Sequence, residues 1–156
     1  MTEQNTRPRP KGREAYRHFT AFATRWRDND QYGHMNNAVY FELFDSAVNK
    51  FLIDSGILAL AGDKTQFLVA SSGCDYFTDV AYPSDVDIGL AVRRIGKSSV
   101  TYDVGLFLAD ADVTAATGVF VHVNVATDDQ RPLAIDAATR EKCAALMIED
   151  LSLIHI

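Results

Sequence analysis

The sequence is poor in cysteine and has no long hydrophobic run. Its 156 residues include only two cysteines, Cys74 and Cys143, too few for a disulfide framework and without the spacing of a metal site. No apolar segment approaches the ~20 residues that are needed to span a bilayer. The basic N-terminal region is not followed by the apolar stretch of a secretory signal. These absences favour a globular cytoplasmic protein with two buried or partly buried thiols.

Basic residues are also scarce outside the N-terminal region. The net charge is −6, yet the first 17 residues carry five basic and two acidic side chains. The rest of the chain is therefore acidic, which argues against a nucleic-acid-binding protein. We predict a flexible basic arm over residues 1–17, a single domain over 18–150 and an apolar tail of unknown role, LSLIHI, over 151–156.

One amphipathic helix is predicted after residue 36. Apolar side chains recur there at three- and four-residue spacing, which is typical of a helix with one buried face: Phe41, Phe44, Val48, Phe51 and Leu52. Asn36 or Asn37 can accept a hydrogen bond from a free N–H of the first turn, and Gly56 is a typical C-terminal stop. The preceding residues, 18–27, alternate well enough for a strand.

The second half of the chain changes to the two-residue period of β-strands. Four segments alternate in this way, at 67–77, 86–95, 98–109 and 117–126. Their short connections favour antiparallel pairing, and Asp136 is expected to cap a last helix that continues to Met147. Because one apolar helix and a sheet with one apolar face must bury each other, the sequence predicts an α+β fold, with about five antiparallel strands curved around the long helix.

A dense polar cluster precedes the helix, in the sequence DNDQYGHMNNAVY at 28–40. Either carboxylate, Asp28 or Asp30, could act as a nucleophile or as a base toward water. Gly33 permits a close backbone approach that a side chain would block. The helix N-terminus offers free N–H groups to a carbonyl oxygen that gains charge during acyl transfer. The same residue types are common as caps and turn formers, so a hydrolytic site and a simple capping turn are both open at this point.

This stretch resembles the signature of the hotdog-fold thioesterases of the 4-hydroxybenzoyl-CoA thioesterase family. The family pattern, Asp-x-Asp-x-x-Gly-His-(Val/Met)-Asn-Asn-x-x-Tyr, is matched in register by Asp28, Asp30, Gly33, His34, Met35, Asn36, Asn37 and Tyr40. Two further segments are similar to the family, CDYFTDVAYPSDVDIGLAVRRIGKSSVTYDV at 74–104 and VHVNVATDDQRPLAI at 121–135. The resemblance runs from Phe19 to Met147 and implies the hotdog fold, in which the curved sheet wraps the long helix.

The resemblance implies hydrolysis of an acyl thioester of coenzyme A or acyl carrier protein to a free acid and a thiol. Asp30 matches the catalytic carboxylate, the main-chain N–H near Asn37 matches the donor that polarises the thioester carbonyl, and His34 is implied to assist. Tyr32 stands where related plant acyl-carrier-protein thioesterases have an asparagine, a departure from their Asp-Asn-His arrangement. No metal and no cofactor beyond the coenzyme A of the substrate is implied. A homodimer or homotetramer is expected.

Substrate contacts are expected at two places. The first is the signature itself, where Gly33 and Tyr40 are candidates, although Tyr40 could instead pack in the core. The second is a cluster near the turn after the third strand, which the resemblance places near the coenzyme A phosphates and which consists of Arg93, Arg94, Lys97 and Ser98. A solvated turn would explain the same cluster. His122, by contrast, is expected to be a structural histidine with satisfied hydrogen bonds.

Two rival functions stay open. One is a hotdog dehydratase or hydratase that acts on acyl thioesters, although the histidine and the carboxylate stand here in the thioesterase register, before the helix. The other is a non-catalytic module that binds an acyl thioester. Such a module would bind its ligand without turnover and would tolerate the change Asp30→Asn.

Overall fold

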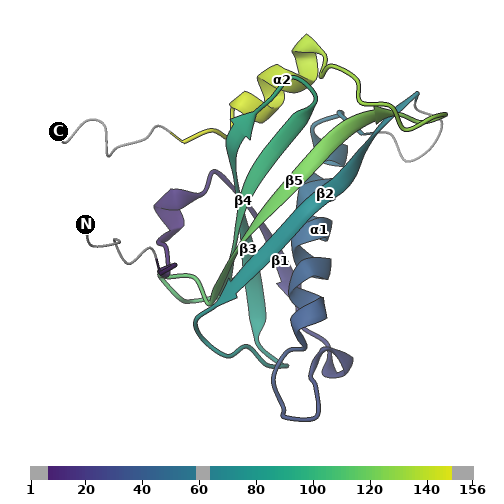
Figure 1. Ribbon diagram of the computed structural model, residues 1–156. Coiled ribbons are helices and arrows are strands. Elements are labelled where there is room, and N and C mark those ends of the chain that lie inside the picture. The colour runs from purple at the N-terminus through teal and green to yellow at the C-terminus, as the bar shows by residue number, and fades with distance from the viewer. Residues whose placement is uncertain (1–6, 59–63, 149–156) are drawn as a thin grey trace, which may run out of the picture.

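The protein is built from one antiparallel sheet and two helices within residues 7–58 and 64–148, the part that the computed structural model describes (Figure 1). The five strands are β1 (His18–Ala23), β2 (Thr65–Tyr76), β3 (Asp85–Ile95), β4 (Ser99–Leu108) and β5 (Ala116–Ala126). They lie in the order β1-β3-β4-β5-β2, and each neighbouring pair is antiparallel. The predicted α+β fold is confirmed. The tail predicted over 151–156 lies outside the described residues.

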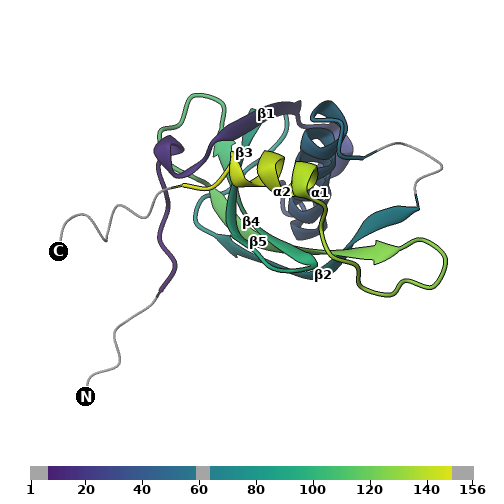
Figure 2. The same cartoon turned by 90° about the horizontal axis from the view of Figure 1, so that it is seen from above.

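The long helix α1 (Asn37–Asp54) lies in the concave side of the sheet (Figures 1 and 2). Its buried side chains are Val39, Tyr40, Leu43, Phe44, Ala47, Val48, Phe51 and Leu52. The predicted stripe was therefore too narrow, and Phe41, which it included, is only partly buried. Because the sheet curves around the helix, more than one face of α1 is covered. Neither helix of the described residues is long and apolar enough to cross a membrane.

The inner face of the sheet is apolar on β3 and β4 but mixed on β5. The pairing places Val100 of β4 opposite His122, and Tyr102 opposite Phe120, so His122 faces α1. The valines at 119, 121 and 123 lie on the outer face and are half-buried. Their alternation is the pattern that predicted this strand. His122 is 1% exposed, and its Nδ1 has no hydrogen-bond partner in the described part of the chain. The expectation of a satisfied histidine is thus wrong for this atom.

Two predicted boundaries differ from those in the structure. β1 ends at Ala23 rather than at residue 27, because the Asp28 carboxylate accepts a hydrogen bond from the Arg25 N–H (2.7 Å) and closes the 3-10 turn η2 (Trp26–Asp28). Asp136 caps the last helix as predicted, but α2 (Ala137–Ala144) is shorter than expected. The Leu146 carbonyl accepts the Val92 N–H at 3.0 Å, and this bond ties the chain after α2 to β3.

The segment before β1 packs on the outer face of the sheet. It contains the 3-10 turn η1 (Arg13–Ala15), and the Tyr16 ring lies over Gly89 and Gly105, two glycines that face each other on β3 and β4. A Cβ on Gly105 would lie 2.5 Å from this ring, so the glycine pair forms the slot that receives it. The flexible arm predicted over 1–17 therefore differs from the structure in its second half, because Tyr16 is only 5% exposed.

Candidate active site

The polar cluster forms a closed loop between η2 and α1, at the lower end of the helix in Figure 1. The Asp30 N–H donates to the His34 carbonyl at 2.7 Å, and the Gly33 N–H donates back to the Asp30 carbonyl at 3.1 Å. The Met35 N–H donates to the Val80 carbonyl at 2.6 Å, which fixes the loop to the segment after β2. Gly33 has a φ of 80°, and a Cβ there would meet nothing within 4 Å. Glycine is therefore favoured at this position for its conformation.

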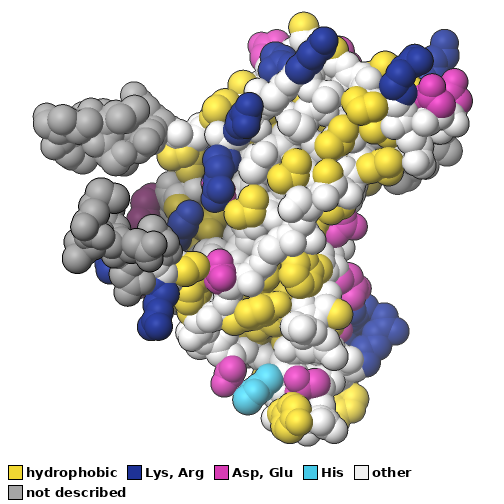
Figure 3. Space-filling model, viewed as in Figure 1, with side chains coloured by type: hydrophobic (Ala, Val, Ile, Leu, Met, Phe, Trp, Pro, Cys, Tyr) yellow, Lys and Arg dark blue, Asp and Glu magenta, His cyan; other side chains and the backbone are white. Residues whose placement is uncertain are grey.

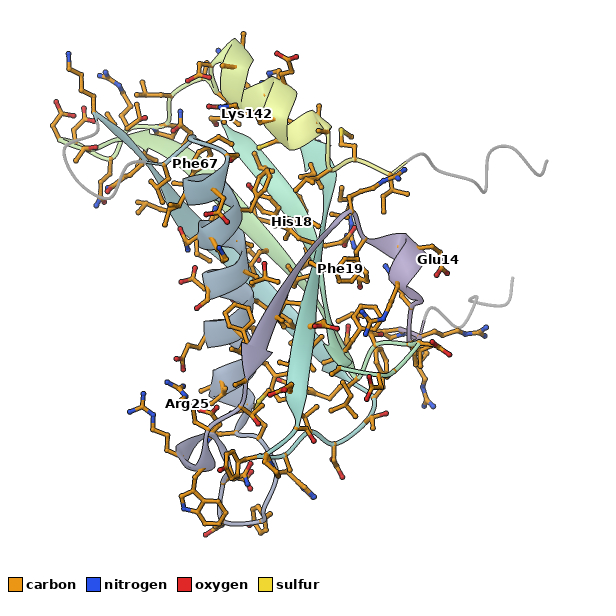
Figure 4. All side chains as sticks on the ribbon, turned by 180° about the vertical axis from the view of Figure 1, so that it is seen from behind. Glu14, His18, Phe19, Arg25, Phe67 and Lys142 are labelled. Atoms are coloured by element: carbon orange, nitrogen blue, oxygen red, sulfur yellow. The ribbon has the colours of Figure 1, made fainter. Side chains whose placement is uncertain are left out.

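The two carboxylates of the loop have different environments. Asp28 is 2% exposed and is held by Arg25, whose Nε donates to Oδ1 at 3.0 Å. Burial acts to raise the pKa of Asp28, but the hydrogen bonds and the charge of Arg25 outweigh it and lower the pKa. Arg25 also contacts Glu42 of α1 at 3.1 Å, beside the first turns of the helix (Figure 4). Asp28 is thus a structural carboxylate that joins η2 to α1.

Asp30 is half-buried and only partly bonded. Its Oδ1 accepts hydrogen bonds from the N–H groups of Tyr32 (2.8 Å) and His34 (3.3 Å). Its Oδ2 accepts none within the described part of the chain. One oxygen therefore holds the carboxylate in place, and the other is available to a ligand. A nucleophile or a general base needs this combination of fixed orientation and free lone pairs.

Asp30 opens onto a cavity of 490 Å³ at the start of α1, which we call the inner cavity. It is lined by Asp30, His34, Met35, Asn36, Asn37, Tyr40, Tyr76, Phe77, Thr78 and Asp79. Asn36 caps the helix by accepting the Ala38 N–H at 3.0 Å, whereas the Asn37 N–H has no acceptor in the described residues. A carboxylate and the positive end of a helix thus line one cavity. No cluster of His, Cys, Asp or Glu among the described residues could hold a metal ion.

Four cavity residues come from the end of β2 and the segment after it, and sequence reasoning did not select them. Among them, Asp79 places Oδ2 at 3.6 Å from His34 Nε2, an ion pair when the imidazole is protonated. Tyr76 packs edge-on against Tyr40, with 4.8 Å between the ring centroids. Tyr40 both packs in the core and lines the cavity, so its two expected roles coincide. These residues reach the site because the Met35 N–H bonds to the Val80 carbonyl. No local sequence pattern predicts this long-range contact.

The predicted cluster near the β3–β4 turn does not reach this site within one chain. The Asp30 loop meets the segment before β3, whereas Arg93 to Ser98 lie at and just beyond the far end of that strand, about 30 Å away. Arg93 instead donates to Asp103 at 3.2 Å, and the carbonyl of Ser98 accepts the Asn124 N–H at 2.7 Å. Figure 3 shows Lys and Arg side chains at the upper end of this face, along its left side and at its lower right.

Residues 24–143 match the family described as the thioesterase-like superfamily. The chain belongs to this superfamily. Its fold superposes on the PA5185 protein of Pseudomonas aeruginosa with a TM-score of 0.86 and 47% identity, covering 89% of this chain and 97% of that one. Slr0204, a 1,4-dihydroxy-2-naphthoyl-CoA thioesterase from Synechocystis, has a TM-score of 0.74 at 11% identity over 81% of this chain and 94% of its own, and so shares the fold. The hotdog arrangement expected from the resemblance is confirmed.

A curated protein is similar to this chain over a shorter range. YsmA of Bacillus subtilis (strain 168) is 26% identical over 94 residues, which are 60% of this chain. The matched part spans 63% of the length of YsmA.

Proposed function

We propose that the protein is a thioester hydrolase that uses Asp30 as its reacting carboxylate. The observation that carries this proposal is the position of Asp30, which lines one cavity together with Asn37 at the start of α1. Among the described residues, the Asp30 carboxylate accepts hydrogen bonds at Oδ1 alone. Membership in the thioesterase-like superfamily supports the same reaction type. The substrate is an acyl thioester of coenzyme A or acyl carrier protein.

In this mechanism the thioester carbonyl oxygen accepts a hydrogen bond from the Asn37 N–H. The helix N-terminus stabilises the negative charge that this oxygen gains as the acyl carbon is attacked. As a general base, Asp30 takes a proton from water while the water oxygen bonds to the acyl carbon, and the proton passes to the departing thiolate. As a nucleophile, an Asp30 carboxylate oxygen bonds to the acyl carbon while the C–S bond breaks and the thiolate departs. Water then hydrolyses the mixed anhydride to the free acid and the Asp30 carboxylate, and the proton that is released goes to the thiolate. His34, which Asp79 can orient, is the candidate to assist proton transfer.

We also propose that two copies pair through β2. This edge strand has 12 residues, Thr65–Tyr76, and pairs with β5 on one side only among the described residues. Unpaired N–H and C=O groups along a long edge are a ready site for another strand, and pairing would cover them. A role for Arg93, Arg94, Lys97 and Ser98 in binding the thiol carrier requires such a second copy, because the cluster is remote from Asp30 in its own chain.

The test is thiol release from a panel of short, medium, long and aromatic acyl-CoAs by wild type, Asp30→Asn and Asp54→Asn. Asp54 is an exposed residue at the other end of α1, so its variant makes the same chemical change away from the cavity. We expect Asp30→Asn to lower kcat by about 10²–10⁴-fold, as for loss of a catalytic acid or base, and Asp54→Asn to retain activity. Both variants are compared by circular dichroism to exclude unfolding.

The same assay separates the rival functions. Tight binding of acyl-CoA without thiol release would indicate a binding module, and an Asp30→Asn variant with wild-type turnover would remove Asp30 from the mechanism. Water loss from a 3-hydroxyacyl-CoA, followed as enoyl-CoA absorbance without thiol release, would indicate a dehydratase.

A further inference from the structure

Asp30 also lines a second cavity, on the side of the loop away from Tyr40. This outer cavity has a volume of 680 Å³ and is lined by Trp26, Arg27, Asn29, Asp30, Gln31 and Gly33. Asp30 is the residue that the two cavities share. A thioester whose carbonyl carbon lies at Asp30 has two substituents, the acyl group and the thiol carrier. The two cavities thus offer one place for each.

An exposed aromatic pair borders the outer cavity. Trp26 is 76% exposed and Tyr82 is 42% exposed, and their rings meet edge to face with 6.0 Å between centroids. Hydrogen bonds fix the position of both residues. The Tyr82 N–H donates to Asn29 Oδ1 at 3.1 Å, and the Arg25–Asp28 contacts close the η2 turn that contains Trp26. Large aromatic side chains held rigidly in water are typical of recognition surfaces.

The two cavities differ in their charged side chains. The inner cavity contains Asp30 and Asp79 and is lined by no lysine or arginine. The outer cavity contains Arg27, which is exposed and forms no hydrogen bond or ion pair with the described residues. In the outer cavity Arg27 balances the charge of Asp30 and offers a phosphate group a cationic partner, whereas the two carboxylates of the inner cavity disfavour phosphate. The inner cavity offers Met35, Tyr40 and Tyr76 to an acyl group instead.

We propose that the outer cavity is the subsite for the nucleotide of coenzyme A, with the adenine ring stacked on Trp26 and a phosphate paired with Arg27. This inference rests on the proposed thioester hydrolysis and deepens it, since it selects coenzyme A thioesters over thioesters of acyl carrier protein. Acyl carrier protein presents its acyl group on phosphopantetheine without adenine. A base stacked on an aromatic side chain contributes about 1–3 kcal/mol, which corresponds to roughly a 5- to 150-fold change in affinity.

Binding is tested first, because it does not depend on turnover. Trp26 is the only tryptophan of the sequence, so the tryptophan emission of the wild-type protein reports on this site alone. We expect saturable quenching by coenzyme A and by adenosine 3′,5′-bisphosphate, and none by pantetheine. Coenzyme A binding that calorimetry detects while the emission stays constant would overturn the proposal, and so would the absence of coenzyme A binding.

Kinetics then separate the carrier from the chemistry. Two substrates are compared, an acyl-CoA and the matching acyl N-acetylcysteamine thioester, which lacks the nucleotide. The quantity measured is the kcat/KM for the acyl-CoA divided by the kcat/KM for the N-acetylcysteamine thioester. We expect Trp26→Ala and Arg27→Gln each to lower this ratio roughly tenfold. Arg131→Gln is the matched control, because Arg131 is an exposed arginine in the turn after β5. An equal loss on both substrates would refute the assignment, since it would mean that the variants disturb the reacting groups.

A further variant distinguishes the competing location. If Arg94→Gln lowers the same ratio and Arg27→Gln does not, the nucleotide lies against the cluster at the β3–β4 turn, and the outer cavity is not its site. The proposed hydrolysis fails in a different way, through an Asp30→Asn variant that retains turnover, and that outcome leaves the fluorescence result unaffected.

Discussion

Acid is expected to destabilise this protein through one buried imidazole, that of His122. The side chain is 1% exposed and lies on the inner face of β5 among the rings of Phe67, Tyr102 and Phe120. Phe67 marks this region in Figure 4, at the end of α1 opposite to Arg25. Burial lowers the pKa of His122 from 6.5 to about 4. The folded protein therefore binds this proton only at a pH well below that at which the unfolded chain binds it.

The sign and size of the effect follow from these two pKa values. Between pH 6.5 and pH 4 the unfolded chain binds a proton that the folded chain excludes, so the free energy of unfolding falls as the pH falls. The complete difference corresponds to about 3 kcal/mol, at about 1.4 kcal/mol per pKa unit. Between pH 7 and pH 5 the expected loss is about 2 kcal/mol. Such a loss is a large part of the ~5–15 kcal/mol that stabilises a typical domain.

Urea unfolding at pH 7, 6 and 5, followed by circular dichroism, measures this loss in wild type, His122→Leu and His122→Gln. The quantity compared is the change with pH, so a variant that is less stable at every pH is still informative. Burial also lowers the pKa of His18, which adds a loss of the same sign, but His18 is present in all three proteins and its contribution cancels. The reasoning is refuted if wild type and both variants lose the same free energy between pH 7 and pH 5.

Two glycine positions give further predictions. Gly105→Ala should destabilise the fold by about 1–3 kcal/mol, because a Cβ would displace the Tyr16 ring. Tyr16→Phe should cost little, because the Tyr16 hydroxyl is buried without a partner in the described residues, and urea unfolding compares the two variants. Gly33→Ala should cost about 1–2 kcal/mol through its positive φ and should lower thiol release, with Gly33→Asn closer to wild type. Equal behaviour of Ala and Asn at position 33 would contradict the conformational explanation.

The periodicity of the sequence predicted most of the fold. The strands and α1 were recognised because apolar side chains recur at spacings of two or of three and four, and the short links left antiparallel pairing as the natural arrangement. Periodicity failed where tertiary contacts decide. In β5 the valines mark the outer face, whereas Phe120, His122 and the small Gly118 face α1, which the pairing with β4 determines. No single-strand pattern contains that information.

The candidate site was predicted only in its local part. The signature places Asp30, His34 and Asn37 before and at the start of a helix, and the structure brings all three to one cavity. Asp79, which contacts His34, is 45 positions away along the chain and reaches the site because Met35 bonds to Val80. The four residues near the β3–β4 turn, Arg93, Arg94, Lys97 and Ser98, lie at or beyond the far end of β3 from the site within one chain. The resemblance groups them with the site, and this grouping stays a prediction that needs a second copy.

The density of polar residues before α1 has a structural explanation, because the signature divides into residues that build the loop and residues that face the cavity. Asp28 belongs to the first group, since it is buried against Arg25 and lines neither cavity, whereas Asp30 belongs to the second. Asp28→Asn should therefore lower stability by about 1–3 kcal/mol, since it weakens a buried charge-assisted contact, while thiol release per folded molecule is largely retained. Asp30→Asn should do the reverse. Measuring urea unfolding and turnover on both variants tests the division, and an Asp28→Asn protein that is stable but inactive would show that the two carboxylates act together in the reaction.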